Sequence, residues 1–182
     1  SDTTVQDSTF SGNNQLEYYI NSVTPLNFEN NTWLLTPIES DVFVSSDGDD
    51  SNDGLTAETA FKTLNHALGS INSNDNFNQT VWVAPGTYSP STTGEIFPLP
   101  LLNNTTVQGT DYEDVIIDAE HTNRVFGGVQ ANNVILRNLT IKGGRALFGG
   151  GVYLENTSID IEDCHITENM VLSEIHAFSK SG

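Results

Sequence analysis

The fold is decided by the stretch Asn133-Val-Ile-Leu-Arg-Asn-Leu-Thr-Ile-Lys142, which returns as Ser158-Ile-Asp-Ile-Glu-Asp-Cys-His-Ile-Thr167. When Val134 is laid on Ile159, apolar positions coincide along both stretches. Short strands that recur at such a period are typical of solenoid folds, in which each repeat stacks on the next. The pattern therefore predicts stacked strands in register.

Weaker copies precede these two. Thr105–Gly109 followed by Val115–Asp118 forms one, and Thr80–Val83 begins another. Upstream of the two strong copies, Gly128-Val-Gln-Ala131 matches Gly151-Val-Tyr-Leu154, a slightly shorter spacing than that between the strong copies. Three short strands in a repeat of about 25 residues predict a parallel β-helix. A leucine-rich repeat is excluded because its Leu spacing and its helix in each repeat are missing.

Alternation along the strands predicts which side chains face the interior of the coil. The predicted interior set is Val134, Leu136, Leu139, Ile141, Ile159, Ile161, Cys164 and Ile166. Arg137 and Glu162 point outward at the same register, so we expect them to lie side by side on adjacent coils. Asn138 and Asp163 fall at the corner between two strands, where a short polar side chain can bond to the backbone.

The N-terminal half carries one helical pattern, with apolar residues at i, i+3, i+4 and i+7 from Leu64 to Ile71 and Thr63 as the predicted N-cap. Further short strands are expected near 16–20, 32–36 and 41–45. The predicted organisation is an extension packed on the β-helix (1–40), the β-helix (41–170) with a capping helix near 63–71, and a C-terminal tail (171–182).

Composition narrows the classes of partner. The 182 residues carry 6 Lys and Arg against 24 Asp and Glu, a net charge of −18. Such a chain is repelled by nucleic acid and by anionic membrane surfaces. No apolar run approaches the length of a membrane span. The single Cys164 excludes an internal disulfide framework, and a polar surface rich in Asn, Thr and Ser fits a secreted or cell-surface protein.

Three motifs in order resemble a known family. These are the run from Val42 to Gly54, the helical run from Ala60 to Leu68, and Val81-Trp-Val-Ala-Pro-Gly-Thr-Tyr88. They resemble the opening of uncharacterised bacterial extracellular proteins in the pectin-lyase-like superfamily. The resemblance implies an all-β, right-handed parallel β-helix of few coils with an N-terminal α-helical cap, and an extracellular polysaccharide as the partner.

One departure from that family concerns the C-terminal end. Members of the family continue for many more coils, whereas here the coil pattern ends near Met170. A final coil exposes unpaired strand edges and inward-facing apolar residues. We therefore expect a two-fold homodimer through the coil from Ile159 to Met170 and the tail.

The acidic loop is a candidate metal site. Asp47, Asp49, Asp50 and Asp53 place four carboxylates within seven positions, and alternating oxygen ligands in a tight turn can bind calcium. A true EF-hand is excluded because Ala60 stands where the bidentate Glu belongs. The alternative is a solvated turn that leads into the capping helix. Any bound calcium is expected to be weak and to stabilise the cap.

The resemblance also suggests a chemistry, the calcium-assisted β-elimination of a polysaccharide lyase acting on a uronate polymer. Such a reaction needs a base, usually Lys or Arg. The weak candidates are Lys142, Arg145 and Arg137, and no carboxylate cluster is expected beside the first two. The alternative is that Arg137 pairs with Glu162 and that Lys142 is a solvated charge.

Trp82 is the candidate carbohydrate-binding residue. Its neighbours Val81 and Val83 are expected to face inward, so the indole should project outward, where it can stack on a sugar ring or lie under the N-terminal segment. The function that the sequence favours is a secreted module associated with an extracellular polysaccharide, with a polysaccharide lyase as the alternative.

Overall fold

The computed structural model describes residues 9–10, 32–33, 37–73 and 78–172. The strands are β1 Thr9–Phe10, β2 Thr32–Trp33, β3 Val42–Val44, β4 Gln79–Val83, β5 Gly86–Tyr88, β6 Leu99–Pro100, β7 Thr105–Gly109, β8 Val115–Asp118, β9 Phe126–Val129, β10 Val134–Arg137, β11 Thr140–Lys142, β12 Arg145–Ala146, β13 Val152–Glu155, β14 Ile159–Glu162, β15 His165–Ile166 and β16 Met170–Val171. The helix is α1, Leu64–Ser70.

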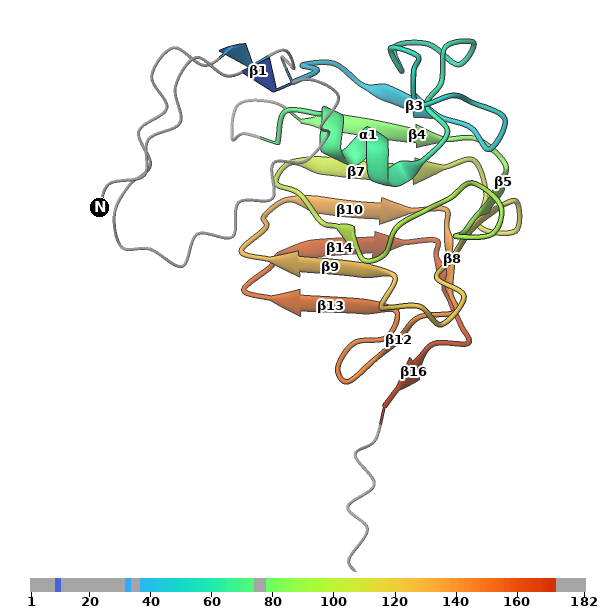
Figure 1. The fold of residues 1–182 in the computed structure, drawn as a ribbon. Coiled ribbons are helices and arrows are strands. Elements are labelled where there is room, and N and C mark those ends of the chain that lie inside the picture. The colour runs from blue at the N-terminus through green and yellow to red at the C-terminus, as the bar shows by residue number, and fades with distance from the viewer. Residues whose placement is uncertain (1–8, 11–31, 34–36, 74–77, 173–182) are drawn as a thin grey trace, which may run out of the picture.

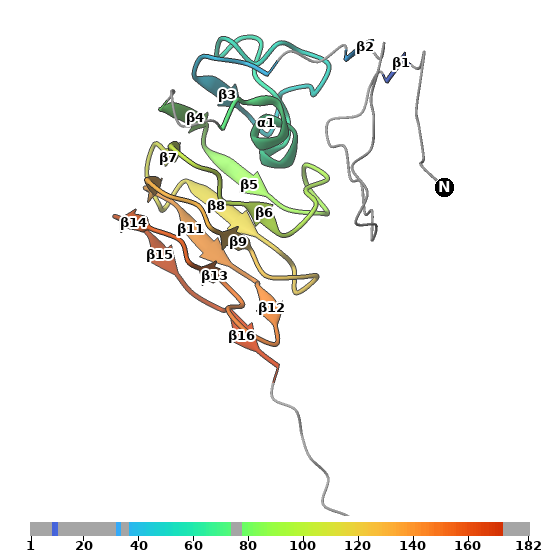
Figure 2. The ribbon, with the colours of Figure 1, turned by 90° about the vertical axis from the view of Figure 1, so that its left-hand side faces the viewer.

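The strands form the predicted parallel β-helix. Its three faces are the parallel sheets β3-β4-β7-β10-β14, β5-β8-β11-β15 and β6-β9-β13. Successive coils stack from β3 and β4 at one end to β14 and β15 at the other (Figures 1 and 2). We call these three faces the first, second and third sheet.

The predicted register is confirmed in the first two sheets. Val134 pairs with Ile159, and Arg137 pairs with Glu162, so the predicted alignment of the two strong copies is right. In the third sheet the predicted alignment of Gly128 with Gly151 is wrong, because Gly128 pairs with Leu154 and Phe126 with Val152. The large side chain of Phe126 occupies the interior with no exposed surface, and this burial, not the match between glycines, sets the register.

The predicted interior residues are buried in the third coil (β10 and β11) and partly exposed in the fourth (β14 and β15). Val134, Leu136, Leu139 and Ile141 have at most 1% of their surface exposed. Their partners one coil on are less covered: Ile159 and Cys164 are half-buried, and Ile161 and Ile166 are 41% and 47% exposed. The inward orientation was therefore predicted correctly, but the expected burial of Cys164 is only partial because no further coil covers it in the described residues.

The corner between the first and second sheets is turned by residues with positive φ. Asn138 has φ 57° and Asp163 has φ 48°. The Asn138 side-chain amide donates to the carbonyls of Gly109 and Thr110, one coil away. The prediction that short polar residues occupy this corner is confirmed, because Asn and Asp tolerate the left-handed conformation better than other residues with a side chain.

The helix α1 covers the first end of the stack. The Thr63 hydroxyl accepts a hydrogen bond from the backbone N–H of His66, as predicted for an N-cap. Leu64, Ala67 and Leu68 are buried, and α1 packs against β3 and β6. The helix therefore takes the place, next to β6, where a further strand of the third sheet would lie.

The predicted terminal segments are described only in part. In the extension predicted for 1–40, β1 pairs in parallel with β2, and Ile38 forms a bridge to Ile71. The strand predicted near 16–20 and most of the tail predicted for 171–182 lie outside the described residues. The homodimer predicted at the C-terminal coil stays a prediction. Among the residues described, no helix is both long and apolar enough to cross a membrane.

Candidate functional site

The outer face of the first sheet carries one column of side chains that crosses all five strands. In register, its members are Phe43, Trp82, Gln108, Arg137 and Glu162. Phe43 and Trp82 are aromatic, and Gln108 carries an amide. Arg137 and Glu162 form an ion pair. Strand stacking brings these residues to one surface although they are far apart in the sequence.

Trp82 projects outward from β4, as predicted, with 42% of its surface exposed. Its indole Nε1 donates to Asp41 Oδ2 at 3.1 Å, and Asp41 Oδ1 accepts the backbone N–H of Thr80 at 2.8 Å. Because both carboxylate oxygens are engaged, Asp41 fixes the edge of the indole in one orientation. An aromatic ring held in this way binds a ligand with little further loss of side-chain entropy.

A groove of about 510 Å³ lies beside Trp82 on this face. Phe43, Trp82 and Gln108 come from the column, Ala57 from the segment between the acidic loop and α1, and Asn138 from the corner of the third coil. Concave sites of roughly 300–1,000 Å³ with apolar walls and a few polar groups are typical for small ligands. We call this cavity the Trp82 groove.

The end of β7 shapes the groove because Gly109 lies against Asn138, the residue at the corner between β10 and β11. A Cβ atom at Gly109 would come within 2.2 Å of the Asn138 carbonyl oxygen. The absence of a side chain lets the two coils approach closely, and Gln108 Nε2 donates to the Gly109 carbonyl at 2.6 Å. The polar end of the groove is thereby held by backbone contacts and is formed before any ligand arrives.

The acidic loop beside the groove uses its carboxylates as caps. Asp50 accepts the backbone N–H groups of Lys62 and Thr63 at 2.8 and 2.9 Å and also the Thr63 hydroxyl. Asp49 accepts the backbone N–H of Ser51, which lowers its pKa. Asp53 accepts the Thr59 hydroxyl at 2.6 Å, which lowers its pKa in the same way. The carboxylates thus stabilise the turns that lead into α1.

The predicted calcium ligands are not brought together as a cluster. Over the described ranges no group of three or more His, Cys, Asp or Glu side chains is arranged to hold a metal ion. Asp47, the fourth predicted ligand, donates its backbone N–H to the Ser45 hydroxyl. Asp49, Asp50 and Asp53 are engaged as described above. Calcium binding at this loop stays a prediction.

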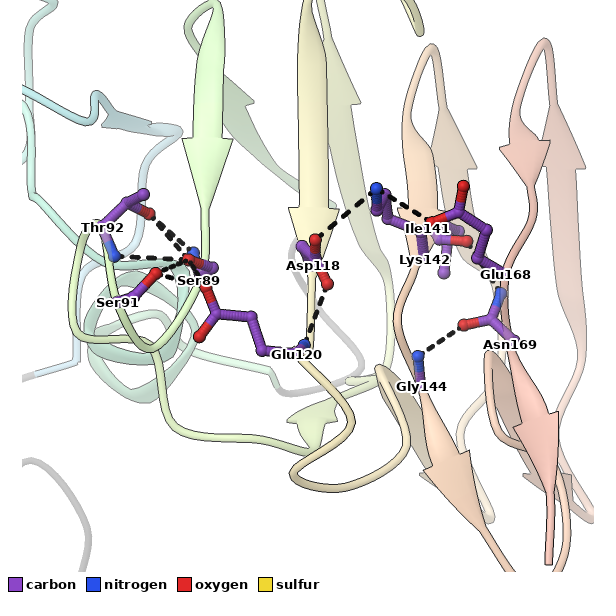
Figure 3. A network of polar contacts seen from close by, with 10 residues as sticks. All are labelled: Ser89, Ser91, Thr92, Asp118, Glu120, Ile141, Lys142, Gly144, Glu168 and Asn169. Atoms are coloured by element: carbon purple, nitrogen blue, oxygen red, sulfur yellow. Dashed lines mark hydrogen bonds and ion pairs between the residues drawn. The ribbon is translucent and has the colours of Figure 1, made fainter.

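Lys142 lies in a different setting from the one expected (Figure 3). Its Nζ is 3.0 Å from Glu168 Oε2 and 3.7 Å from Asp118 Oδ2, at the end of the second sheet. The expectation that no carboxylates lie beside it is therefore wrong, because stacking brings them in from the coils on either side. The contact with Glu168, followed by the charge of Asp118, raises the pKa of Lys142. Lys142 is thus held as a cation.

The three cations predicted as weak catalytic candidates are not assembled into one site. Arg137 lies on β10 of the first sheet, Lys142 on β11 of the second, and Arg145 on β12 in the small sheet with β16. Arg137 pairs with Glu162 as predicted, with 2.5 Å between Nη2 and Oε2. Arg145 is exposed. No shared surface joins the three side chains to a single substrate.

A polar network that the sequence analysis missed holds the loop after β5 (Figure 3). Glu120 Oε1 accepts the hydroxyls of Ser89 and Ser91, which lowers the pKa of Glu120. Ser89 is fully buried, and its backbone N–H donates to Thr92 Oγ1. Glu120 is far from its two serine partners in the sequence, so no local pattern indicates the network.

Glu95 is the second group that the sequence analysis missed. It is 3% exposed, and its two oxygens accept the backbone N–H groups of Leu64 at 2.6 Å and Asn65 at 3.1 Å. Burial, partly offset by these hydrogen bonds, raises its pKa to about 7. Glu95 therefore fixes the first turn of α1 to the loop before β6.

The comparisons with known proteins concern the N-terminal coils. Residues 46–114 match a family described as a protein of unknown function, DUF1565. No curated protein and no solved structure matches the chain. The matched residues run from the acidic loop through α1 and β4 to the loop after β7, and they include Trp82. The chain is thus a parallel β-helix whose first coils are similar to the DUF1565 family.

Proposed function

We propose that this chain is a carbohydrate-associated β-helix module of the pectin-lyase-like superfamily that binds an extracellular polysaccharide in the Trp82 groove. The observation that carries the proposal is the half-exposed ring of Trp82, fixed at its edge by Asp41 and standing beside a preformed cavity. Sugar rings present flat faces of C–H groups and a rim of hydroxyls. An aromatic wall with nearby amides suits both features.

The polar composition, rich in Asn, Thr and Ser, supports an extracellular location for the module. The net charge of −18 disfavours a phosphate-rich partner. Two aromatic rings near the other sheets are engaged within the protein. Tyr153, on β13, is covered by the guanidinium of Arg124 at 4.2 Å from the ring centroid, and Tyr112 packs edge-on against His165 of β15. The first sheet is therefore the favoured face for a glycan.

The alternative, a polysaccharide lyase, has less support. A base must lose its proton to accept one from the substrate. The carboxylates around Lys142 oppose that loss, and Arg137 is paired with Glu162. We therefore place binding ahead of β-elimination.

Binding is tested by affinity electrophoresis through gels that contain single polysaccharides. The wild-type chain should be retarded by at least one of them, and Trp82→Ala should migrate as in an empty gel. Phe148→Ala is the matched control, because Phe148 is 70% exposed and is not part of the groove. Retardation that Trp82→Ala preserves would refute the site. A separate assay incubates the protein with polygalacturonate and calcium and follows ultraviolet absorbance. Release of an unsaturated product would show that the protein is a lyase and would overturn the binding-module proposal.

A further inference from the structure

The Trp82 groove differs in charge from the rest of the molecule. None of the described residues that line it is charged, although the chain carries 24 acidic side chains. We infer that the groove takes uncharged sugar units and excludes uronates. This inference rests on the proposed function and adds the class of glycan.

The nearest charges explain why a uronate is excluded. Asp41 accepts hydrogen bonds from the Trp82 indole and from the backbone N–H of Thr80, and it does not line the groove. Arg137, the cation nearest along the column, gives its Nε and Nη2 to Glu162 and its Nη1 to Gln108 Oε1 at 3.3 Å. A uronate carboxylate would lose water in the groove and find no free cation there among the described residues. Burial of an unpaired charge is strongly unfavourable.

The polar groups of the groove suit hydroxyls. The lining includes the hydroxyls of Ser45 and Thr110 and the side-chain amides of Gln108 and Asn138. The two amides keep hydrogen-bonding capacity beyond their contacts with Arg137 and the backbone of β7, so the lining contains both donors and acceptors. Neutral sugars offer the same mixture of donors and acceptors along their edges. A site of this kind discriminates by hydrogen bonds and ring stacking, which depend little on salt.

The groove is also elongated along the axis of the β-helix. Its lining comes from four successive levels, which include Phe43, Trp82, Gln108 and Asn138. Neighbouring strands are about 4.8 Å apart, so three spacings extend over about 14 Å. A short stretch of a glycan chain that lies along this axis contacts all four levels.

Matched pairs of polymers test the inference. Polygalacturonate and its fully methyl-esterified form share one backbone and differ mainly in charge, and galactan serves as a second, neutral polymer. Binding of all three is measured by isothermal titration at low and high salt. We expect galactan or the methyl ester to bind, with little dependence on salt, and free polygalacturonate to bind at least about tenfold more weakly. Thr110→Lys should raise the affinity for polygalacturonate at low salt, whereas Thr110→Gln should not.

The outcomes separate the two proposals. Stronger binding of free polygalacturonate, lost in Trp82→Ala, would overturn the neutral-sugar inference and leave the binding function intact. No binding of a wide panel of neutral and acidic polysaccharides would overturn both. A change of oligomeric state in Trp82→Ala, measured by light scattering, would show that a second copy occupies the groove and would also overturn the inference.

Discussion

Replacement of Glu95 should change how the stability of the protein depends on pH. The Glu95 carboxyl is buried at the start of α1, where Asp50 also accepts backbone N–H groups of the preceding turn. Burial is the main cause of its raised pKa, and the charge of Asp50 adds to it. Burial is also the main cause of the raised pKa of Tyr88, and the charge of Glu95 adds to it. The buried carboxyl therefore favours its protonated form in the folded state.

The size and direction of the effect follow from the two pKa values of Glu95. A change from 4.5 in the unfolded chain to about 7 in the folded protein corresponds to about 3 kcal/mol. Between pH 4.5 and about 7, Glu95 holds its proton in the folded state but loses it in the unfolded state. The contribution is therefore complete below about pH 4.5 and is lost as the pH rises through about 7.

The assay is chemical denaturation of wild type and Glu95→Gln, followed by tryptophan fluorescence from pH 4.5 to 8. The amide of Gln can accept only one of the two backbone N–H groups, so wild type should be the more stable protein at low pH. Its advantage should shrink by about 3 kcal/mol by pH 8 and vanish or reverse. Glu58→Gln, at an exposed position, controls for the lost charge. A difference between wild type and Glu95→Gln that stays constant with pH would refute the reasoning.

Three other predictions concern the coils and the acidic loop. A double-mutant cycle of Arg137→Ala and Glu162→Ala should give a coupling free energy of at most about 1 kcal/mol that falls with salt, because both side chains are more than a third exposed. Calcium and chelator should give melting curves that differ by little, since ligand binding raises the melting temperature and Asp50 is already engaged by backbone donors; a large rise with calcium would contradict this expectation. Cys164 should react slowly with a thiol reagent at neutral pH because burial raises its pKa, and labelling as fast as that of a free thiol would count against its inward orientation.

The register of the first sheet was predictable because buried residues alternate with more exposed ones along β4, β7 and β10. A slip of one residue would turn Val134 and Leu136 outward, so burial permits one pairing. The third sheet was not predictable in the same way. The likeness of Gly128 to Gly151 suggested the wrong alignment, because Phe126 must enter the core, and loops of variable length absorb the difference.

The candidate site was predictable only as far as single strands allow. The outward orientation of Trp82 followed from Val81 and Val83, which are both buried. The groove itself also needs Ala57 from the segment before α1 and Asn138 from a corner two coils away, and alternation along one strand does not predict such a contact. Glu95 and the cluster around Lys142 were missed for a similar reason, since their partners lie far away in the sequence, on α1 and on neighbouring coils respectively.

Because of this dependence on stacking, the residues of the Trp82 groove do not form one contiguous sequence motif. Each coil contributes one outward side chain at each position, so a binding surface forms as a column across coils, and Phe43, Trp82 and Gln108 are three steps of one column. Beyond Gln108 the column continues to Arg137, whose pairing with Glu162 neutralises the cation that borders the groove. The ion pair contributes little to stability because it is exposed. The ion pair instead has an electrostatic effect, because it leaves no unpaired positive charge from Arg137 beside the Trp82 groove. The groove is thus a neutral binding surface on an otherwise acidic molecule.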